Sequence, residues 1–158
     1  DREPERRRSR EQDEAGDALQ AVDVGRGCAF GDFDNDGRLD VLINNLDGPP
    51  TLLRNECRNT NAWIQIKCVG TRSNRSAIGT RVKVTSGGRS QIDEVMSGSS
   101  YYSQSDLRLH FGLGLADTVD AVEVRWPSGS KEAFQNLPAN HLYVVEETKG
   151  IVSRRPFA

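Results

Sequence analysis

The chain has 158 residues and a formal net charge of −2, because 21 basic side chains nearly balance 23 acidic ones. This length supports one or two small domains with a hydrophobic core, and the near-neutral charge argues against a protein whose main partner is a nucleic acid. Hydrophobic residues make up 35% and aromatic residues 6%, while 15 glycines are present. This composition is typical of a β-rich protein with many turns.

Residues 1–21 mix charges of both signs with almost no large apolar side chain, which predicts a disordered charged arm. The basic triplet at 6–8 is balanced by nearby acids, so we interpret it as solvated and not as a lipid or nucleic-acid contact. No apolar run in the chain is long enough for a membrane span. The sequence begins with Asp1, so we expect a processed or excised piece of a longer protein, for which a missing signal peptide leaves secretion open.

An acidic loop follows the apolar segment that ends at Phe30. Aspartates occupy positions 1, 3, 5 and 9 of this loop and Gly37 occupies position 6, which is the spacing of a calcium loop. Position 7 supplies only a backbone carbonyl in such loops, so any side chain is allowed there. The expected Ca²⁺ ligands are the carboxylates of Asp32, Asp34, Asp36 and Asp40 and the carbonyl of Arg38.

Position 12 of the loop is Ile43, where the helix-loop-helix type of calcium site has a bidentate glutamate. Residues 39–45 are short, aliphatic and closed by Asn and Gly-Pro-Pro, which indicates a strand. The loop is therefore predicted to join two strands. An acidic solvated turn without an ion is the weaker interpretation, because four aspartates with this spacing repel one another unless a cation is present.

The three cysteines are Cys28, Cys57 and Cys68, and no C-x-x-C pair occurs among them. His110 and His141 are distant in sequence, so a structural zinc site is not expected. Cys28 and Cys68 fall in apolar runs and are interpreted as small buried residues. A disulfide between Cys57 and Cys68 in an oxidising compartment stays open as the less favoured alternative.

From residue 61 onward, alternating apolar residues are separated by Gly, Ser and Asn. In the first segment Ile64, Ile66 and Cys68 form the apolar face. Strands are predicted at residues 62–68, 81–85, 91–96, 107–111, 119–126, 131–134 and 141–146. Many short strands without a helical period predict an all-β antiparallel sandwich or barrel over residues 61–148, followed by a flexible tail at 149–158.

Every charged residue between Cys57 and Ile92 is basic, and acidic residues dominate the next thirty positions. One interpretation is a basic surface for a polyanion or glycan, with Arg72 and Arg75 as candidate contacts. The favoured interpretation is that basic and acidic strands lie side by side and pair across the sheet. The low aromatic content also argues against nucleic acid as a partner.

Two other functional classes, a hydrolase and a sugar-binding module, are weighed against the sequence. The segment Ser97-Gly98-Ser99-Ser100 is rich in serine, but it has no G-x-S-x-G elbow, so a hydrolase is the weakest interpretation and no catalytic residue is assigned. Adjacent strand residues face opposite sides of a sheet, so one of Tyr101 and Tyr102 is expected to face outward. These two tyrosines are the candidate platform for stacking a sugar.

Several motifs in order carry a family resemblance. Residues 25–45, around the acidic loop, resemble an FG-GAP/VCBS-type repeat, the unit of calcium-binding blades in β-propellers. The segments at 70–75, 78–82, 97–101 (SGSSY), 109–114 (LHFGLG) and 124–129 (VRWPSG) resemble the ASPIC/UnbV domain of the cartilage acidic protein family. The resemblance implies a repeat at 22–60 followed by an ASPIC/UnbV-like β module at 61–148.

Taken together, these features predict a non-enzymatic calcium-binding β module, extracellular or periplasmic, that serves recognition or adhesion. Calcium is expected to be structural, and the partner is expected to be an unidentified protein or glycan of the matrix or cell envelope. A single blade-like unit exposes both sheet faces unless it is covered. We therefore expect it to pack on the following module through four apolar side chains, namely Val41, Ile43, Leu52 and Leu53.

Overall fold

The structure is a computed structural model, and it describes residues 24–156. The expected arm at 1–21 lies outside the described residues. Within them the chain forms eleven strands and no helix, so no helix there is able to cross a membrane. The strands are β1 (Gly25–Gly31), β2 (Asp40–Asn45), β3 (Thr51–Leu53), β4 (Ala62–Val69), β5 (Arg81–Ser86), β6 (Arg89–Glu94), β7 (Leu109–Gly114), β8 (Thr118–Arg125), β9 (Lys131–Pro138), β10 (His141–Glu146) and β11 (Gly150–Pro156).

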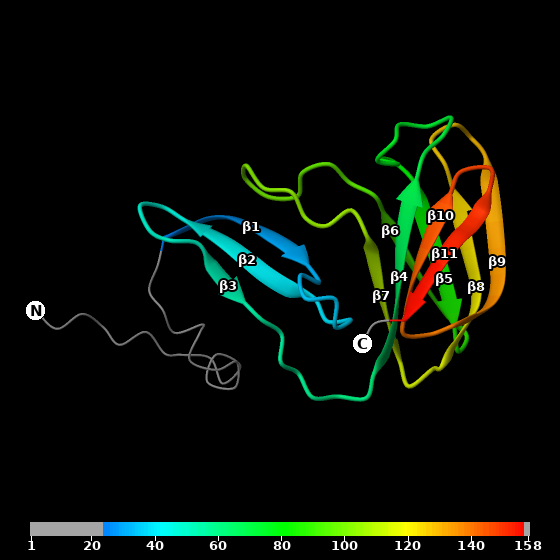
Figure 1. Cartoon of the computed structure of the whole chain (residues 1–158), viewed down its shortest axis with the longest axis horizontal. Helices are drawn as coiled ribbons and strands as arrows, with labels where there is room; N and C mark the ends of the chain where they lie inside the picture. Colours follow the sequence, from blue (N-terminus) through cyan, green and yellow to red (C-terminus); the bar gives the residue numbers. More distant parts are fainter. Residues whose placement is uncertain (1–23, 157–158) are drawn as a thin grey trace, which may run out of the picture.

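The first three strands form a small antiparallel sheet, which lies apart from the other strands in Figure 1. β1 and β2 make a hairpin whose last pair joins Gly31 to Asp40, so residues 32–39 form its tip. β3 adds to the other side of β2. The predicted arrangement of two strands joined by the acidic loop is therefore confirmed.

The other eight strands form two four-stranded sheets, in the orders β11-β10-β4-β7 and β6-β5-β8-β9, and the two sheets face each other as a sandwich (Figure 1). Alternating apolar residues from both sheets fill the space between them, as the period-2 pattern predicts. The core includes Ile64, Ile66, Cys68, Leu109, Phe111, Tyr143 and Val145 from one sheet and Val82, Val84, Val119, Val122 and Val124 from the other. The all-β fold class is confirmed, and burial of each large aliphatic side chain contributes about 1.5–3 kcal/mol.

Two features of the sandwich differ from the sequence-based expectation. β4 and β10 are parallel, whereas a purely antiparallel arrangement was expected. Parallel neighbours require a long connection, and here the chain between the two strands forms β5 and β6 of the opposite sheet, returns as β7, and then forms β8 and β9. In addition, the tail expected at 149–158 contains β11, which pairs antiparallel with β10 after a tight turn.

The hairpin sheet contacts the sandwich through β1 and the acidic loop. The amide of Asp106 donates to the carbonyl of Phe30 at 2.8 Å, and the amide of Phe30 donates to Ser105 Oγ at 3.2 Å. Leu52, which was expected to carry this packing with Val41, Ile43 and Leu53, is 48% exposed, so that expectation is wrong for Leu52. Polar groups along the edge strand β1 make the connection, because the open edge of a sheet offers unpaired backbone groups.

A buried carboxylate closes one end of the sandwich. Glu147 directly follows β10, is fully buried, and accepts hydrogen bonds at Oε2 from the backbone amides of Thr71, Arg72 and Ser73 at 2.7–2.9 Å. Ser73 Oγ and Ser128 Oγ donate to Oε1 at 3.0 and 2.5 Å. Glu147 thereby ties together the loop after β4, the turn after β8 and the end of β10.

These contacts determine the protonation of Glu147. Burial by itself raises the pKa of the carboxyl group, but the hydrogen bonds from Ser128 and from the amides of Ser73, Thr71 and Arg72 outweigh burial and hold the pKa at about 2, below the usual 4.5. The folded state therefore prefers the ionised form. Its contribution to stability is complete above pH 4.5 and is lost as the pH falls toward 2.

We expect Glu147→Gln to lower the free energy of unfolding by about 3 kcal/mol at pH 7, because an amide donor then faces several buried donors. The matched control is Glu123→Gln, which removes a surface ion pair to Lys83 and is expected to cost less than about 1 kcal/mol. Urea denaturation between pH 2 and 7 measures both. Wild-type stability should decline between pH 4.5 and 2 more steeply than that of Glu147→Gln, and parallel curves would contradict the role of this carboxylate.

Candidate metal centre

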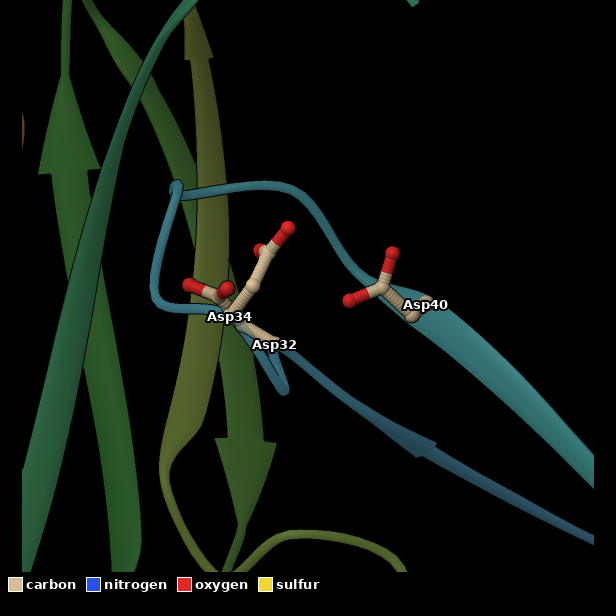
Figure 2. Close-up of side chains that lie close together, drawn as sticks. All are labelled: Asp32, Asp34 and Asp40. Atoms are coloured by element: carbon tan, nitrogen blue, oxygen red, sulfur yellow. The ribbon is translucent and has the colours of Figure 1, made fainter. Parts of the chain in front are cut away.

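Three aspartate carboxylates converge at the tip of the hairpin. Asp32 and Asp34 lie on the loop after β1, and Asp40 begins β2 on the other side of the loop (Figure 2). One oxygen from each lies within 4.8 Å of the other two. Asp32 and Asp40 are buried and Asp34 is half-buried. Like charges this close are unfavourable without a compensating cation.

Asp32 and Asp40 also hold the loop backbone in place. Asp32 accepts the amides of Asp36 and Gly37 at 2.9 Å each, one on each oxygen. Asp40 accepts the amides of Phe33 and Asn55 at 3.1 and 2.8 Å. A carboxylate has roughly four acceptor positions, so both side chains keep acceptor capacity for an ion.

Asp34 provides the observation that tests whether a cation fits here. Its Oδ2 accepts a hydrogen bond from Arg54 Nε at 2.8 Å, while its Oδ1 is buried and has no hydrogen-bond partner. The same hydrogen bond and the charge of Asp34 raise the pKa of Arg54, so the guanidinium stays charged. A buried carboxylate oxygen without a partner is costly, and a hard cation with oxygen ligands satisfies it. The residues present therefore fit a calcium ion.

Two of the five predicted ligand residues lie outside this group of three. The carboxylate of Asp36 accepts the backbone amide of Arg38 at 2.9 Å and forms an ion pair with the Arg38 guanidinium. Asp36 remains in the loop next to the group, and Arg54 Nη2 lies 3.9 Å from its Oδ2. Whether Asp36 and the carbonyl of Arg38 bind the ion stays a prediction.

The sandwich supplies contacts to this loop that the sequence analysis missed. Residues of β4 and the start of β7 reach the loop: Trp63, Gln65, Arg108 and His110. Gly37 lies against the ring of Trp63 so closely that an added Cβ there would lie 2.2 Å from the indole. The only sequence signal for these contacts was the alternation of residues in β4. It places Gln65 on the face of the strand that points away from the core, but it does not predict which segment covers that face.

The predicted ligand residues outside the acidic loop occupy two separate loops. Tyr101 and Tyr102 lie between β6 and β7, and their rings meet edge to face at 4.7 Å. Both rings are exposed, Tyr102 by 91% and Tyr101 by 53%, and the guanidinium of Arg26 lies over the Tyr101 ring at 5.0 Å. Arg72 and Arg75 lie on the exposed loop between β4 and β5, so the structure does not bring the two pairs into one site.

The cysteines and the serine-rich segment contain the other candidate nucleophiles. All three cysteines are free thiols, so the Cys57–Cys68 alternative is not realised. Burial, with a smaller effect of Glu132, raises the pKa of the Cys68 thiol to about 12, which makes it a poor nucleophile. His110 Nε2 is bound to the Gly37 carbonyl at 2.9 Å, so this ring nitrogen is engaged by the loop backbone.

Fold and site together define a β-sandwich module preceded by a small sheet with a candidate metal loop. The model of the family described as ASPIC and UnbV matches residues 70–152, which is more than half of the chain. The chain belongs to the ASPIC and UnbV family.

Cartilage acidic protein 1 of three animals is similar to this chain. The Homo sapiens protein is 31% identical over 136 residues, which cover 84% of this chain and 20% of that protein. The Mus musculus protein is 32% identical and the Xenopus tropicalis protein 30% identical, each over 118 residues that cover 72% of this chain and 18% of that protein. The chain thus spans about a fifth of the length of the curated relatives that it matches.

We expect Gly37→Ala to displace the loop from the sandwich, because the new methyl group clashes with Trp63 and because Gly37 has φ of +86°. Gly129→Ala is the control, since Gly129 has a similar φ of +90° but no atom within 4 Å of an added Cβ. In the control, backbone strain alone should lower the free energy of unfolding, by about 1–2 kcal/mol. Tryptophan fluorescence and urea denaturation compare the two variants, and equal losses with unchanged emission would contradict the contact.

Proposed function

We propose that this chain is a non-enzymatic, calcium-binding β module of the extracellular space or cell envelope, and that its calcium is structural. The observation that carries the proposal is the convergence of Asp32, Asp34 and Asp40 around a buried Oδ1 of Asp34 that has no partner. These three side chains would hold the ion, with Asp36 and the carbonyl of Arg38 as further ligands. When bound, calcium supplies positive charge that relieves repulsion between the carboxylates.

The balance of charge in the loop supports a divalent cation. The four aspartates carry four negative charges, and the guanidinium groups of Arg38 and Arg54 pair with Asp36 and Asp34. Two negative charges remain, on Asp32 and Asp40, and both of these side chains are buried. A divalent ion neutralises this remainder, and oxygen ligands favour calcium over softer metals.

The relatives and the exposed surface support the proposed location and the kind of partner. The printed name of the similar animal proteins associates them with cartilage, which supports an extracellular setting, or a periplasmic one in a bacterial source. In this proposal β1–β3 are an FG-GAP/VCBS-type repeat, and the sandwich presents a surface for recognition or adhesion. The 91% exposed Tyr102 is the leading candidate contact for a protein or glycan partner, whose identity stays open.

Calorimetric titration tests the calcium site. We expect wild-type protein to bind Ca²⁺ at about 0.1–1 mM, the range of extracellular modules, and Asp34→Asn to weaken binding at least about tenfold. The exposed Asp120 lies outside the loop on β8, so Asp120→Asn should bind like the wild type. Absence of calcium-dependent heat in the wild type, or equal affinity in all three proteins, would refute the site. Asp36→Asn, measured in the same way, determines whether Asp36 leaves Arg38 to join the ligands.

A second candidate function, polyanion binding, is favoured by one specific observation. Arg81, Arg125 and Lys131 stand directly opposite one another on β5, β8 and β9, along a groove of about 490 Å³. Cross-strand pairing accounts for other charges, because Lys83 bonds Glu123 at 2.8 Å and Arg81 lies 3.6 Å from Glu94. Within residues 24–156, neither Arg125 nor Lys131 has an ion-pair partner. Like charges directly opposite are unfavourable, and a sulfated polysaccharide would relieve the repulsion.

Heparin chromatography tests this second function. We expect the double variant Arg125→Gln/Lys131→Gln to elute at clearly lower salt than the wild type, because removing two cations weakens a screened electrostatic attraction. Arg72→Gln/Arg75→Gln is the comparison, with the same charge change on the loop between β4 and β5, whose two arginines the sequence analysis proposed as contacts. An equal shift in both double variants would indicate nonspecific charge attraction, and wild-type elution at very low salt would exclude the function.

A further inference from the structure

We propose that Gln65, Arg108 and His110 of the sandwich are positioning residues for the calcium loop, so that calcium binding and docking of the hairpin onto the sandwich strengthen each other. The proposal rests on the calcium site proposed above. It adds that the loop is incomplete without the ASPIC/UnbV module, because side chains of this module hold the loop from outside the group of ligands.

Gln65 makes the most direct contact. Its neighbours Ile64 and Ile66 face the core, so Gln65 faces outward, yet it is only 1% exposed because the loop covers it. Its Nε2 donates to Asp32 Oδ2 at 2.8 Å, while its Oε1 is buried without a partner. The amide thus presents its donor side to the carboxylate even though its acceptor side is left unsatisfied, which is the orientation required to fix Asp32.

Arg108 and His110 hold the backbone of the same loop. Arg108 Nη2 donates to the carbonyl of Asp32 at 2.8 Å and Nη1 donates to Asn35 Oδ1 at 2.7 Å. Asp106 fixes the guanidinium from the other side, with its Oδ2 at 2.5 Å from Arg108 Nε. His110 Nε2 donates to the Gly37 carbonyl at 2.9 Å. Residues of the sandwich therefore contact the loop at both ends of its sharp turn.

The contact between β1 and the sandwich is polar and incompletely packed. Four hydrogen bonds join β1 to the loop between β6 and β7, including Cys28 N to Ser100 Oγ at 3.3 Å. A cleft of about 290 Å³ remains beside them, lined in part by Phe30, Gln65 and Met96. Each such hydrogen bond contributes only about 0.5–1.5 kcal/mol, so docking is weak enough for the free energy of calcium binding to shift it.

The coupling is reciprocal by thermodynamic necessity. If docking fixes Asp32 for the ion, then the ion must favour the docked hairpin by the same factor. Partners that orient metal ligands from the second layer typically change metal affinity 10- to 100-fold. The buried Asp32 carboxylate is the shared element, because it belongs to the ligand group and also accepts the hydrogen bond from Gln65.

The test compares calcium affinity in Gln65→Met and wild-type full-length chain by calorimetry. Methionine has a similar size but cannot donate to Asp32. It also removes the unsatisfied Oε1, which offsets part of the cost of the lost hydrogen bond, so the sandwich should stay folded without calcium. We expect the Kd for Ca²⁺ to rise 10- to 100-fold. Glu147→Gln is the control, because it weakens the sandwich far from the loop and should leave the Kd unchanged under native conditions.

Amide hydrogen exchange of the wild-type protein provides a second readout. In wild-type protein, calcium should slow exchange at the amides of Phe30 and Asp106, which bridge the hairpin and the sandwich, and Asp34→Asn should abolish this effect. Two results would overturn the coupling and leave the calcium site intact. In one, the wild type binds calcium without slower exchange at these amides; in the other, Gln65→Met binds calcium with the same affinity as the wild type. A wild-type chain that binds no calcium would instead overturn the proposed function.

Discussion

The burial of the Asp32 carboxylate is the constraint on which the relation between the two parts of the molecule depends. This residue is 1% exposed, and a charged side chain buried in this way requires hydrogen-bond donors or cations beside it. Two amides of its own loop and the side chain of Gln65 provide the donors. The loop cannot leave the sandwich without removing one of them. A local turn made of short polar residues is therefore tied to a β-sheet that lies more than thirty residues further along the chain.

The second buried carboxylate, Glu147, uses the same chemistry for a different purpose. Both Asp32 and Glu147 accept several backbone amides, which provide a buried carboxylate with hydrogen-bond donors. Glu147 accepts hydrogen bonds from five donors, so hydrogen bonds satisfy it. Asp32 shares its surroundings with Asp34 and Asp40 and retains a repulsion that hydrogen bonds do not remove. This difference separates a structural clamp from a candidate metal site.

The strands were largely predictable from the sequence because each depends on local alternation, as at Ile64 and Ile66, and the sandwich follows from burying those faces. The acidic loop was predictable because its spacing is local too. Three features were not predictable, because each depends on which distant segments meet. They are the contact of the acidic loop with Gln65, the hydrogen bonds to Glu147 and the pairing of β11 with β10. Ligand geometry was predictable only in part. Asp36 fits the spacing of a calcium loop, but the side chain of Arg38, two residues later, competes for it.

The small size of the β1–β3 sheet explains why a calcium ion at the hairpin tip would contribute to its stability. A sheet of three short strands buries little apolar surface by itself, and here Leu42 and Leu52, paired across β2 and β3, are each nearly half exposed. Its order must therefore come from contacts at its edge and tip. The edge strand β1 is bonded to the loop that carries Tyr101 and Tyr102, and the tip carries the aspartates. Calcium at the tip, on the proposed function, thus stabilises the surface around Tyr102 through β1, while the well-packed sandwich remains unchanged.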